Sequence, residues 1–430
     1  MKYCARCLYP ANAKPTIILD EEGVCSGCRY HESRKHLEID WEERQEVFEE
    51  ILDEARKMAH QRGNAHDCII PVSGGKDSQF QVWLLTKKYG MNPLLVKYNH
   101  AFNAPSGVAN LETLVEKSGC DLERYTAGLD SVRRISRYMV EKVGDITWHY
   151  HAGIRTYPFQ VAVARNIPLI IWGEHGFAEL TGIVSLEDFV EFTKWTRKEH
   201  DMRGIEAHEL IGQGDITEKD IAPYVYPSDE DIARVGVRGI YLSNFIYWDG
   251  KKQAEKVMEE WGFQTVTYKR ERTFNLHAKL DDHANDIHDY MKYLKFGYGR
   301  GTDDASMEIR HGRMTREEGI EMVRQYDATT PSTLPMYCDF MGISVEEFYK
   351  FIEPMRDHSI WEKTEKGVWQ VKDSVVRHPI GPWEERAKLP INNDHTFAPH
   401  NRALYYNDAN PPKPCGDPAF DVKPARFKVL

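Results

Sequence analysis

The sequence predicts an α/β fold in which a doubly wound parallel sheet lies between helices on both faces. Short apolar runs rich in β-branched residues alternate with segments of helical periodicity over residues 60–270. Strands that alternate with helices in this way imply right-handed crossovers between parallel strands. Two Cys-x-x-Cys pairs precede this region and charge-rich helical segments follow it. We therefore also expect a small metal-binding N-terminus and a helical C-terminal region.

The individual elements are expected in a regular order. An amphipathic helix at 41–59 precedes the sheet. The predicted strands, all short apolar runs, are 67–72, 93–98, 121–127, 167–172 and 237–245. The helices predicted to alternate with them are 80–87, 110–117, 132–143, 157–165 and 251–261. The helices predicted after the sheet are 281–294, 315–326 and 345–356.

This order divides the chain into four expected parts. They are a four-cysteine element at 1–35, an α/β domain at 60–270, a helical substrate or partner region at 271–375, and a Pro-rich tail at 376–430. Within the second part, residues 176–235 are polar and irregular, with one helical piece near 186–197. We expect that segment to be an insertion beside the sheet.

Length and composition exclude several classes of protein. The chain has 430 residues, of which 41% are hydrophobic and 29% are charged, as in ordinary globular proteins. The formal charge of −11 argues against broad binding to nucleic acid, which needs a basic surface. No apolar run reaches the length of a membrane span, and the N-terminus resembles no secretory signal. We therefore expect a cytoplasmic protein in which the eight cysteines stay reduced.

The first predicted strand leads into the loop Ser73-Gly74-Gly75-Lys76-Asp77-Ser78 and then into a helix. Free amides at a helix N-terminus, together with two adjacent glycines, form a cradle for a phosphate. A carboxylate in such a cradle is repulsive unless a cation bridges it, so Asp77 indicates Mg²⁺. The Walker A and dinucleotide-binding patterns are both absent. The alternative is a Gly-Gly turn that happens to precede a helix.

This loop resembles the signature Ser-Gly-Gly-x-Asp-Ser of the PP-loop ATP pyrophosphatases, which have an adenine nucleotide alpha hydrolase-like fold. The resemblance implies that residues 73–78 bind the phosphates of ATP and that Lys76, Asp77 and Ser78 act in catalysis. It implies that the substrate oxygen is adenylated, pyrophosphate leaves, and a nitrogen or sulfur nucleophile displaces AMP. It also places adenosine near Lys97 and Tyr98, at the end of the second strand, and near Gly173.

The four N-terminal cysteines have the spacing of a metal site. Cys4 and Cys7 form one pair, Cys25 and Cys28 form the other, and the two pairs lie close enough to complete a tetrahedron. A closed four-thiolate zinc site is structural, so we expect an ordering element rather than a reaction centre. An iron–sulfur cluster and four unrelated thiols remain the alternatives.

Further candidates follow the strand at 167–172, because ligands of parallel sheets lie beyond the carboxyl ends of the strands. We predict Glu174 or Glu179 as a Mg²⁺ ligand and His175 as a substrate contact, with a solvated turn as the alternative. Arg300, Arg310 and Arg313 are predicted to bind a phosphate or carboxylate of the substrate, unless they form salt bridges with nearby acidic residues. A second metal site is conceivable at the three histidines His277, His283 and His288, although packed or solvated side chains are favoured.

Several segments resemble one family within this superfamily. They are the opening Cys-x-x-Cys-Leu-Tyr-Pro, the run 20–28, the glycine-rich run 295–303, and the run 309–319 with Tyr326-Asp327. These segments are similar to the N-acetyl sugar amidotransferases of bacterial surface-polysaccharide synthesis over most of residues 1–350. The tail is not part of the pattern.

The resemblance implies a reaction and a partner. An acetamido group on a sugar or nucleotide-sugar would be adenylated, and ammonia would displace AMP to give an acetamidino group. A separate glutaminase would supply the ammonia, since no Gly-x-Cys-x-Gly nucleophile motif occurs in this chain. The alternatives are a tRNA thiolation enzyme of the same superfamily and a non-catalytic nucleotide-binding scaffold for a glutaminase.

Overall fold

Five parallel strands form the central sheet of the computed structural model, which describes residues 2–36, 39–183 and 189–377. The strands are β1 (Cys68–Pro71), β2 (Pro93–Asn99), β3 (Leu122–Thr126), β4 (Leu169–Trp172) and β5 (Arg238–Tyr241). Their order across the sheet is β3-β2-β1-β4-β5. Every neighbouring pair is parallel, so the predicted doubly wound fold is confirmed.

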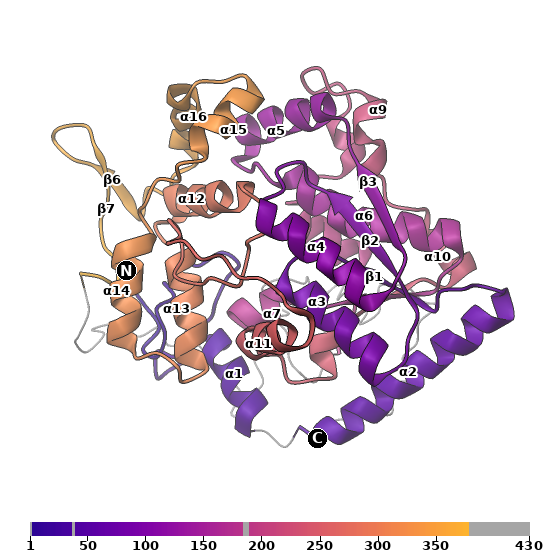
Figure 1. The fold of residues 1–430 in the computed structure, drawn as a ribbon. Helices are drawn as coiled ribbons and strands as arrows, with labels where there is room; N and C mark the ends of the chain where they lie inside the picture. Colours follow the sequence, from indigo (N-terminus) through magenta and orange to yellow (C-terminus); the bar gives the residue numbers. More distant parts are fainter. Residues whose placement is uncertain (1, 37–38, 184–188, 378–430) are drawn as a thin grey trace.

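Helices cover both faces of this sheet (Figure 1). One face is packed by α2 (Trp41–Arg62), α3 (Lys76–Trp83), α4 (Pro105–Ser118) and α11 (Gly250–Trp261). The other face is packed by α6 (Trp148–Arg165) and α10 (Asp229–Val235). Alternate side chains of β1 serve the two cores: Cys68 and Ile70 face α2, whereas Ile69 faces α6.

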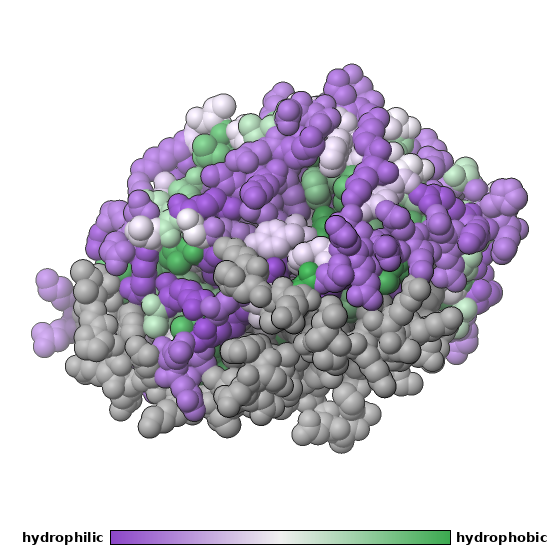
Figure 2. Space-filling model, turned by 90° about the horizontal axis from the view of Figure 1, so that it is seen from below, coloured by the Kyte–Doolittle hydropathy of each residue, from purple (hydrophilic) through white to green (hydrophobic). Residues whose placement is uncertain are grey.

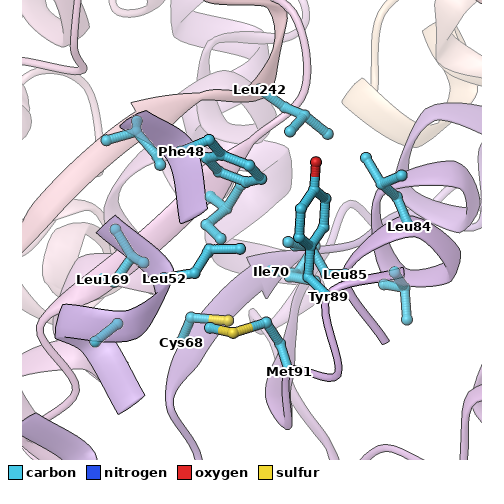
Figure 3. Packing of buried hydrophobic residues seen from close by; sticks show 14 of the residues in the cluster. Phe48, Leu52, Cys68, Ile70, Leu84, Leu85, Tyr89, Met91, Leu169 and Leu242 are labelled. Carbon is cyan, nitrogen blue, oxygen red and sulfur yellow. The ribbon is translucent and has the colours of Figure 1, made fainter. Parts of the chain in front are cut away.

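The core beneath α2 is built from aromatic and aliphatic side chains (Figure 3). Phe48 of α2 stacks on Phe245 with ring centroids 5.0 Å apart and meets Tyr89 edge-on at 5.2 Å. Cys68 is fully buried and lies beside Met91 in this core. A π-helical turn, Leu84–Lys88, extends α3 and brings Leu84 and Leu85 into this core.

The predicted insertion contains several short helices. They are α7 (Gly176–Thr181), α8 (Lys194–Thr196), α9 (Glu218–Ile221) and α10. The helix predicted at 186–197 is wrong in its start: 184–188 lie outside the described residues, and 189–193 are not helical. Helical structure begins at Lys194 because Thr193 forms a capping box with Thr196. The last strand is also shorter than predicted, since a 3₁₀ turn over Leu242–Asn244 follows β5.

A group of helices follows the sheet and packs beside it (Figure 1). Its members are α12 (Ala284–Phe296), α13 (Arg300–Arg310), α14 (Arg316–Tyr326), α15 (Leu334–Met341) and α16 (Val345–Ile352). A two-stranded hairpin of β6 (Trp361–Lys363) and β7 (Trp369–Val371) comes next. Neither α13 nor the hairpin was predicted. Residues 378–430, most of the predicted Pro-rich tail, lie outside the described residues.

The N-terminal segment returns to the sheet through α1 (Ser26–His36), which packs against α7. α5 (Leu129–Val143) joins the helical region through contacts with α15 and α16. Seen from below, the coloured surface is mostly hydrophilic, with hydrophobic residues in small separate groups (Figure 2). None of the helices in the described part of the chain is long and apolar enough to cross a membrane.

Candidate functional site

The glycine loop lies at the point where the strand order of the sheet reverses. β2 lies on one side of β1, and β4 lies on the other. Residues 73–78 follow β1, and the turn that begins at Gly173 follows β4. The carboxyl ends of two strands at such a reversal are the usual ligand site of an open α/β sheet. The fold therefore places the two segments predicted to bind ATP next to each other.

The loop ends in a free helix N-terminus. Gly75 is the N-cap of α3, and no side chain caps the helix. Ser73 Oγ accepts a hydrogen bond from the Gly75 amide at 3.1 Å, and Ser78 Oγ donates to the Gly75 carbonyl at 3.0 Å. The amides of the first helical turn have no acceptor within the helix, and the helix dipole is positive at this end. This arrangement can bind an anion such as the phosphates of ATP.

Close backbone packing explains the glycine at position 74. Gly74 has φ +105°, and a Cβ there would overlap the carbonyl oxygen of Gly107 at the start of α4. A Cβ at Gly107 would in turn overlap the backbone of Asp281. Three segments far apart in the sequence thus lie in direct backbone contact behind the phosphate cradle. Side chains at either glycine would separate them.

Two carboxylates of like charge lie near each other at the loop. Asp77 pairs with Lys76 at 2.5 Å. Burial, followed by the charge of Asp77, raises the pKa of Glu174 to about 7. A cation between Asp77 and Glu174 would remove this repulsion, so the two residues fit the predicted Mg²⁺. Glu179, the other predicted ligand, instead has both carboxylate oxygens within 2.8 Å of Arg34.

The end of β2 supports the loop through one side chain. Lys97 is buried, and its Nζ donates to the Ser73 carbonyl at 2.9 Å. The side chain of Tyr98 points to the core, where its hydroxyl lies 2.8 Å from that of Tyr224. Of the two residues predicted near adenosine, Lys97 thus contacts the phosphate loop, and Tyr98 has only backbone to offer there.

His175 bonds within its own helix. It is the N-cap of α7, and its Nδ1 accepts from the Ala178 amide at 3.2 Å. The ring is buried against Tyr241, with centroids 4.8 Å apart. Burial lowers the pKa of His175 to about 3, so the ring is neutral and its Nδ1 is engaged. Its predicted contact with substrate stays a prediction.

The four cysteine thiols converge as predicted. Their sulfur atoms all lie within 4.8 Å of one another and are buried. The Cys7–Cys25 sulfur distance is 3.6 Å, and the Cys4–Cys28 distance is 3.9 Å. A tetrahedral Zn²⁺ with Zn–S bonds of about 2.3 Å separates its sulfurs by about 3.8 Å. The donor set therefore fits one metal ion, and this is the only group of three or more potential ligands found in 2–36, 39–183 and 189–377.

Arg310 covers this centre. Its Nη2 donates to Cys25 Sγ at 3.5 Å, and its Nη1 donates to the Leu180 carbonyl at 2.8 Å. Its guanidinium also lies 5.1 Å from the ring centroid of Tyr9. A Cβ at Gly27 would overlap this guanidinium, so the glycine of the second cysteine pair leaves room for the arginine. Arg310 thus contacts the predicted metal ligands. The sequence predicted a contact with substrate for this residue and gave no sign of its contact with the cysteines.

The other two predicted arginines bind carboxylates. Arg300 forms a two-pronged ion pair with Asp289, at 2.9 Å for each bond. Arg313 binds Glu308 through two bonds, at 2.7 and 2.8 Å, and Asp249 at 2.8 Å. These pairs agree with the alternative prediction that the arginines form salt bridges. Two of the partners, Asp289 and Asp249, are not among the acidic residues close to the arginines in sequence. Substrate binding by these arginines stays a prediction.

Some residues near the loop were not predicted as ATP-site residues. Burial, followed by the charge of Lys76, lowers the pKa of His277 to about 4, so this histidine lies near the loop rather than in a second metal site. Arg34 of α1 pairs with Glu179 and has no local motif that could have marked it. Gly250 packs against Lys76 and so borders the same site, as does Gly173, which was predicted there and packs against Gln81.

Comparison with known proteins identifies one family. Residues 251–375 match the family model described as LPS biosynthesis protein WbpG-like, C-terminal domain. This match confirms the family resemblance predicted from the sequence. An uncharacterized protein from Methanocaldococcus jannaschii is 26% identical over 156 residues, which are 34% of this chain and 54% of that protein. The chain therefore spans about half the length of this curated relative.

One solved structure is also similar. It is the U34-tRNA thiolase NcsA from Methanococcus maripaludis with its 4Fe–4S cluster, at 12% identity. The match covers 73% of this chain and 87% of that chain, with a TM-score of 0.27. At this score the likeness supports no conclusion about the reaction or the metal of the present chain.

Proposed function

Residues 251–375 form a WbpG-like C-terminal domain of LPS biosynthesis, and on this premise we propose that the chain is an ATP-dependent N-acetyl sugar amidotransferase. The substrate is an acetamido sugar or its nucleotide-linked form. The observation that carries the proposal is the free N-terminus of α3 at the strand reversal, with Asp77 and Glu174 beside it. This arrangement supports ATP binding at a site where a second substrate can approach.

The residues of the loop have distinct roles in this reaction. The amides of residues 74–78 bind the β- and γ-phosphates, and Lys76 neutralises negative charge as pyrophosphate leaves. Asp77 and Glu174 would hold Mg²⁺, which supplies charge neutralisation on the phosphates when bound. The Ser73 carbonyl is fixed by Lys97, so the loop keeps its shape without ligand. Positioning and charge neutralisation suffice, because no protein nucleophile is required.

The chemistry has two steps. The acetamido oxygen attacks the α-phosphorus of ATP, an O–P bond forms, and pyrophosphate leaves. Ammonia then attacks the activated acetamido carbon and loses a proton. The C–O bond breaks, and its electron pair leaves with AMP. The original oxygen leaves on AMP, and the product is an acetamidino group.

Zinc is the metal that we propose for Cys4, Cys7, Cys25 and Cys28, in a structural role. The sulfur distances support a single ion, because an iron–sulfur cluster would separate the thiolates with several iron atoms. We also propose that a separate glutaminase supplies the ammonia. The proposed location is the cytoplasm, where ATP is available.

Pyrophosphate release tests this function. We expect purified protein with ATP, Mg²⁺ and ammonium chloride to release pyrophosphate only when an acetamido sugar is present, and mass spectrometry to detect the amidine. Release without any sugar dependence would contradict the proposal. Loss of 2-thio-nucleosides from the tRNA of a deletion strain would instead favour thiolation.

A further inference from the structure

The polar insertion at 176–235 encloses a cavity that lies outside the phosphate loop. Its volume is about 630 Å³. Three stretches of the insertion line this cavity, at 193–198, 206–208 and 225–226. Cavities of this size typically hold small organic ligands such as cofactors. The insertion therefore has room for a ligand of its own.

A buried arginine joins the three stretches that line the cavity. Arg197 is fully buried, and its Nη2 donates to both carboxylate oxygens of Glu206 at 2.8 Å. Its guanidinium also lies 4.6 Å from the ring centroid of Tyr226. All three residues line the cavity. Because these contacts hold the stretches together, the cavity keeps its shape without a ligand.

The lining combines aromatic rings with ammonium groups. Trp195 and Tyr226 are only partly buried, so parts of both side chains can be reached from solvent. Lys194 lies at the exposed rim, where it pairs with the exposed Asp229 at 2.9 Å, and such a pair is weak. Lys198 is half-buried and makes no ion pair within 2–36, 39–183 and 189–377. The cavity therefore favours an anion that also carries a planar ring.

One aromatic ring separates this cavity from the turn that follows β4. The ring centroid of Trp195 lies 5.7 Å from that of His200, which in turn lies 6.5 Å from that of His175. His175 directly follows Glu174, one of the two proposed Mg²⁺ ligands. A ligand that occupies the cavity can therefore extend toward the ATP site.

Resting on the proposed function, we propose that this cavity binds the nucleotide part of a nucleotide-linked acetamido sugar. The base stacks on Trp195 and Tyr226, as bases commonly stack on aromatic side chains. Lys194 and Lys198 bind the phosphates as point charges, and Glu206 accepts from a ribose hydroxyl. The sugar then extends toward the ATP site. ATP and the nucleotide of the substrate thus occupy separate sites.

Calorimetry of the full chain tests this site without catalysis. The probes are UDP and GDP, each added after the loop has been saturated with Mg²⁺ and the ATP analogue AMP-PNP. The variants are Trp195→Ala, which removes a stacking ring, and Lys198→Met, which removes a charge but keeps the length of the side chain. Lys219→Met is the matched control, because Lys219 is exposed in the same insertion but does not line the cavity.

The two cavity variants should weaken nucleotide binding and leave the ATP site intact. We expect at least one probe to bind the wild type, and its affinity to fall at least about tenfold in Trp195→Ala and Lys198→Met but not in Lys219→Met. The affinity for AMP-PNP should stay within about twofold in all variants, which also shows that they are folded. In sugar-dependent ATP–pyrophosphate exchange, Lys198→Met should raise the KM for the nucleotide-linked acetamido sugar but not for the free sugar.

The other outcomes overturn the inference. If neither probe binds the protein saturated with AMP-PNP, the cavity is no nucleotide site. If a probe binds equally well to Lys198→Met, Trp195→Ala and the wild type, the nucleotide lies elsewhere and the inference is wrong. In both cases sugar-dependent exchange in the wild type would leave the proposed function standing. If a probe binds in the cavity but no acetamido sugar supports exchange, the proposed function fails, and the assignment of this nucleotide to the substrate fails with it.

Discussion

Arg310 donates to Cys25 Sγ at 3.5 Å with one nitrogen and to the Leu180 carbonyl at 2.8 Å with another. Four thiolates around a divalent ion carry a net charge of about −2, so a buried guanidinium beside them offsets part of that charge. Leu180 lies in α7, which begins just after Glu174. Ser26 also donates to the Thr181 carbonyl at 2.5 Å. The cysteine centre therefore holds the end of the helix whose start adjoins the ATP site.

The contact with Arg310 should control how tightly the metal is held. We expect Arg310→Met to release metal about tenfold faster to a chromophoric chelator, because the thiolate charge is no longer offset. Arg313→Met is the matched control, since Arg313 lies on the same segment but binds Glu308 and Asp249. Equal release rates in the two variants would contradict a role for Arg310 at the metal.

Gly74 should tolerate no side chain. Gly74→Ala places a Cβ against the Gly107 carbonyl at φ +105°, so we expect the ATP affinity measured by calorimetry to fall at least about tenfold. Gly63→Ala is the control: Gly63 also has a positive φ, at +66°, but nothing lies within 4 Å of its Cβ position. That variant should cost about 1 kcal/mol of stability and leave ATP binding unchanged. Equal ATP affinity in both would show that close packing does not shape the cradle.

Asp77 should act in catalysis rather than in folding. We expect Asp77→Asn to slow pyrophosphate release about a hundredfold or more, because one of the two proposed Mg²⁺ ligands beside the phosphates is lost. The thermal transition should stay close to that of the wild type, since Asp77 is about a third exposed. Asp53→Asn on the exposed side of α2 is a neutral control. Normal turnover in Asp77→Asn would argue strongly against this site.

Buried histidines should make the protein sensitive to mild acid. Burial lowers the pKa of His149 from 6.5 to about 3 in the folded state. As the pH falls below 6.5, the unfolded chain binds a proton that the folded chain does not, so the free energy of unfolding decreases. Each such histidine costs on the order of 2 kcal/mol by about pH 5.

Denaturation at two pH values checks this prediction. His149→Asn should lose less stability than the wild type between neutral pH and about pH 5, by on the order of 2 kcal/mol. His208→Asn, at an exposed position, should behave like the wild type. An identical pH dependence in all three proteins would show that His149 is not held neutral.

The cysteine centre should contain one zinc ion per chain. We expect elemental analysis of protein purified without oxygen to find zinc, and no absorption of iron–sulfur type in the visible range. Cys25→Ser should lower both the metal content and the thermal stability, because one ligand of the closed site is lost. Unchanged metal stoichiometry in that variant would contradict the assigned ligands.

The parts of this protein that could be predicted are those encoded in consecutive residues. The strand, glycine loop and helix around residues 68–83 follow from local pattern, and so do the two cysteine pairs. The partners of Arg300 and Arg310 could not be predicted, because Asp289 and the thiolates reach them only through the packing of α13. α13 itself was missed because the glycines before it resemble a loop, although Gly299 is its N-cap.

The backbone contact between Gly107 and Asp281 has a consequence for how such chains can be recombined. Asp281 belongs to the part that matches the WbpG-like domain, and Gly107 touches the phosphate loop through Gly74. In a chimera that joins the first half of this protein to the second half of a relative, the backbone around position 281 would have to fit closely against Gly107. An exchange of either half alone would therefore be expected to disturb the packing behind the phosphate loop.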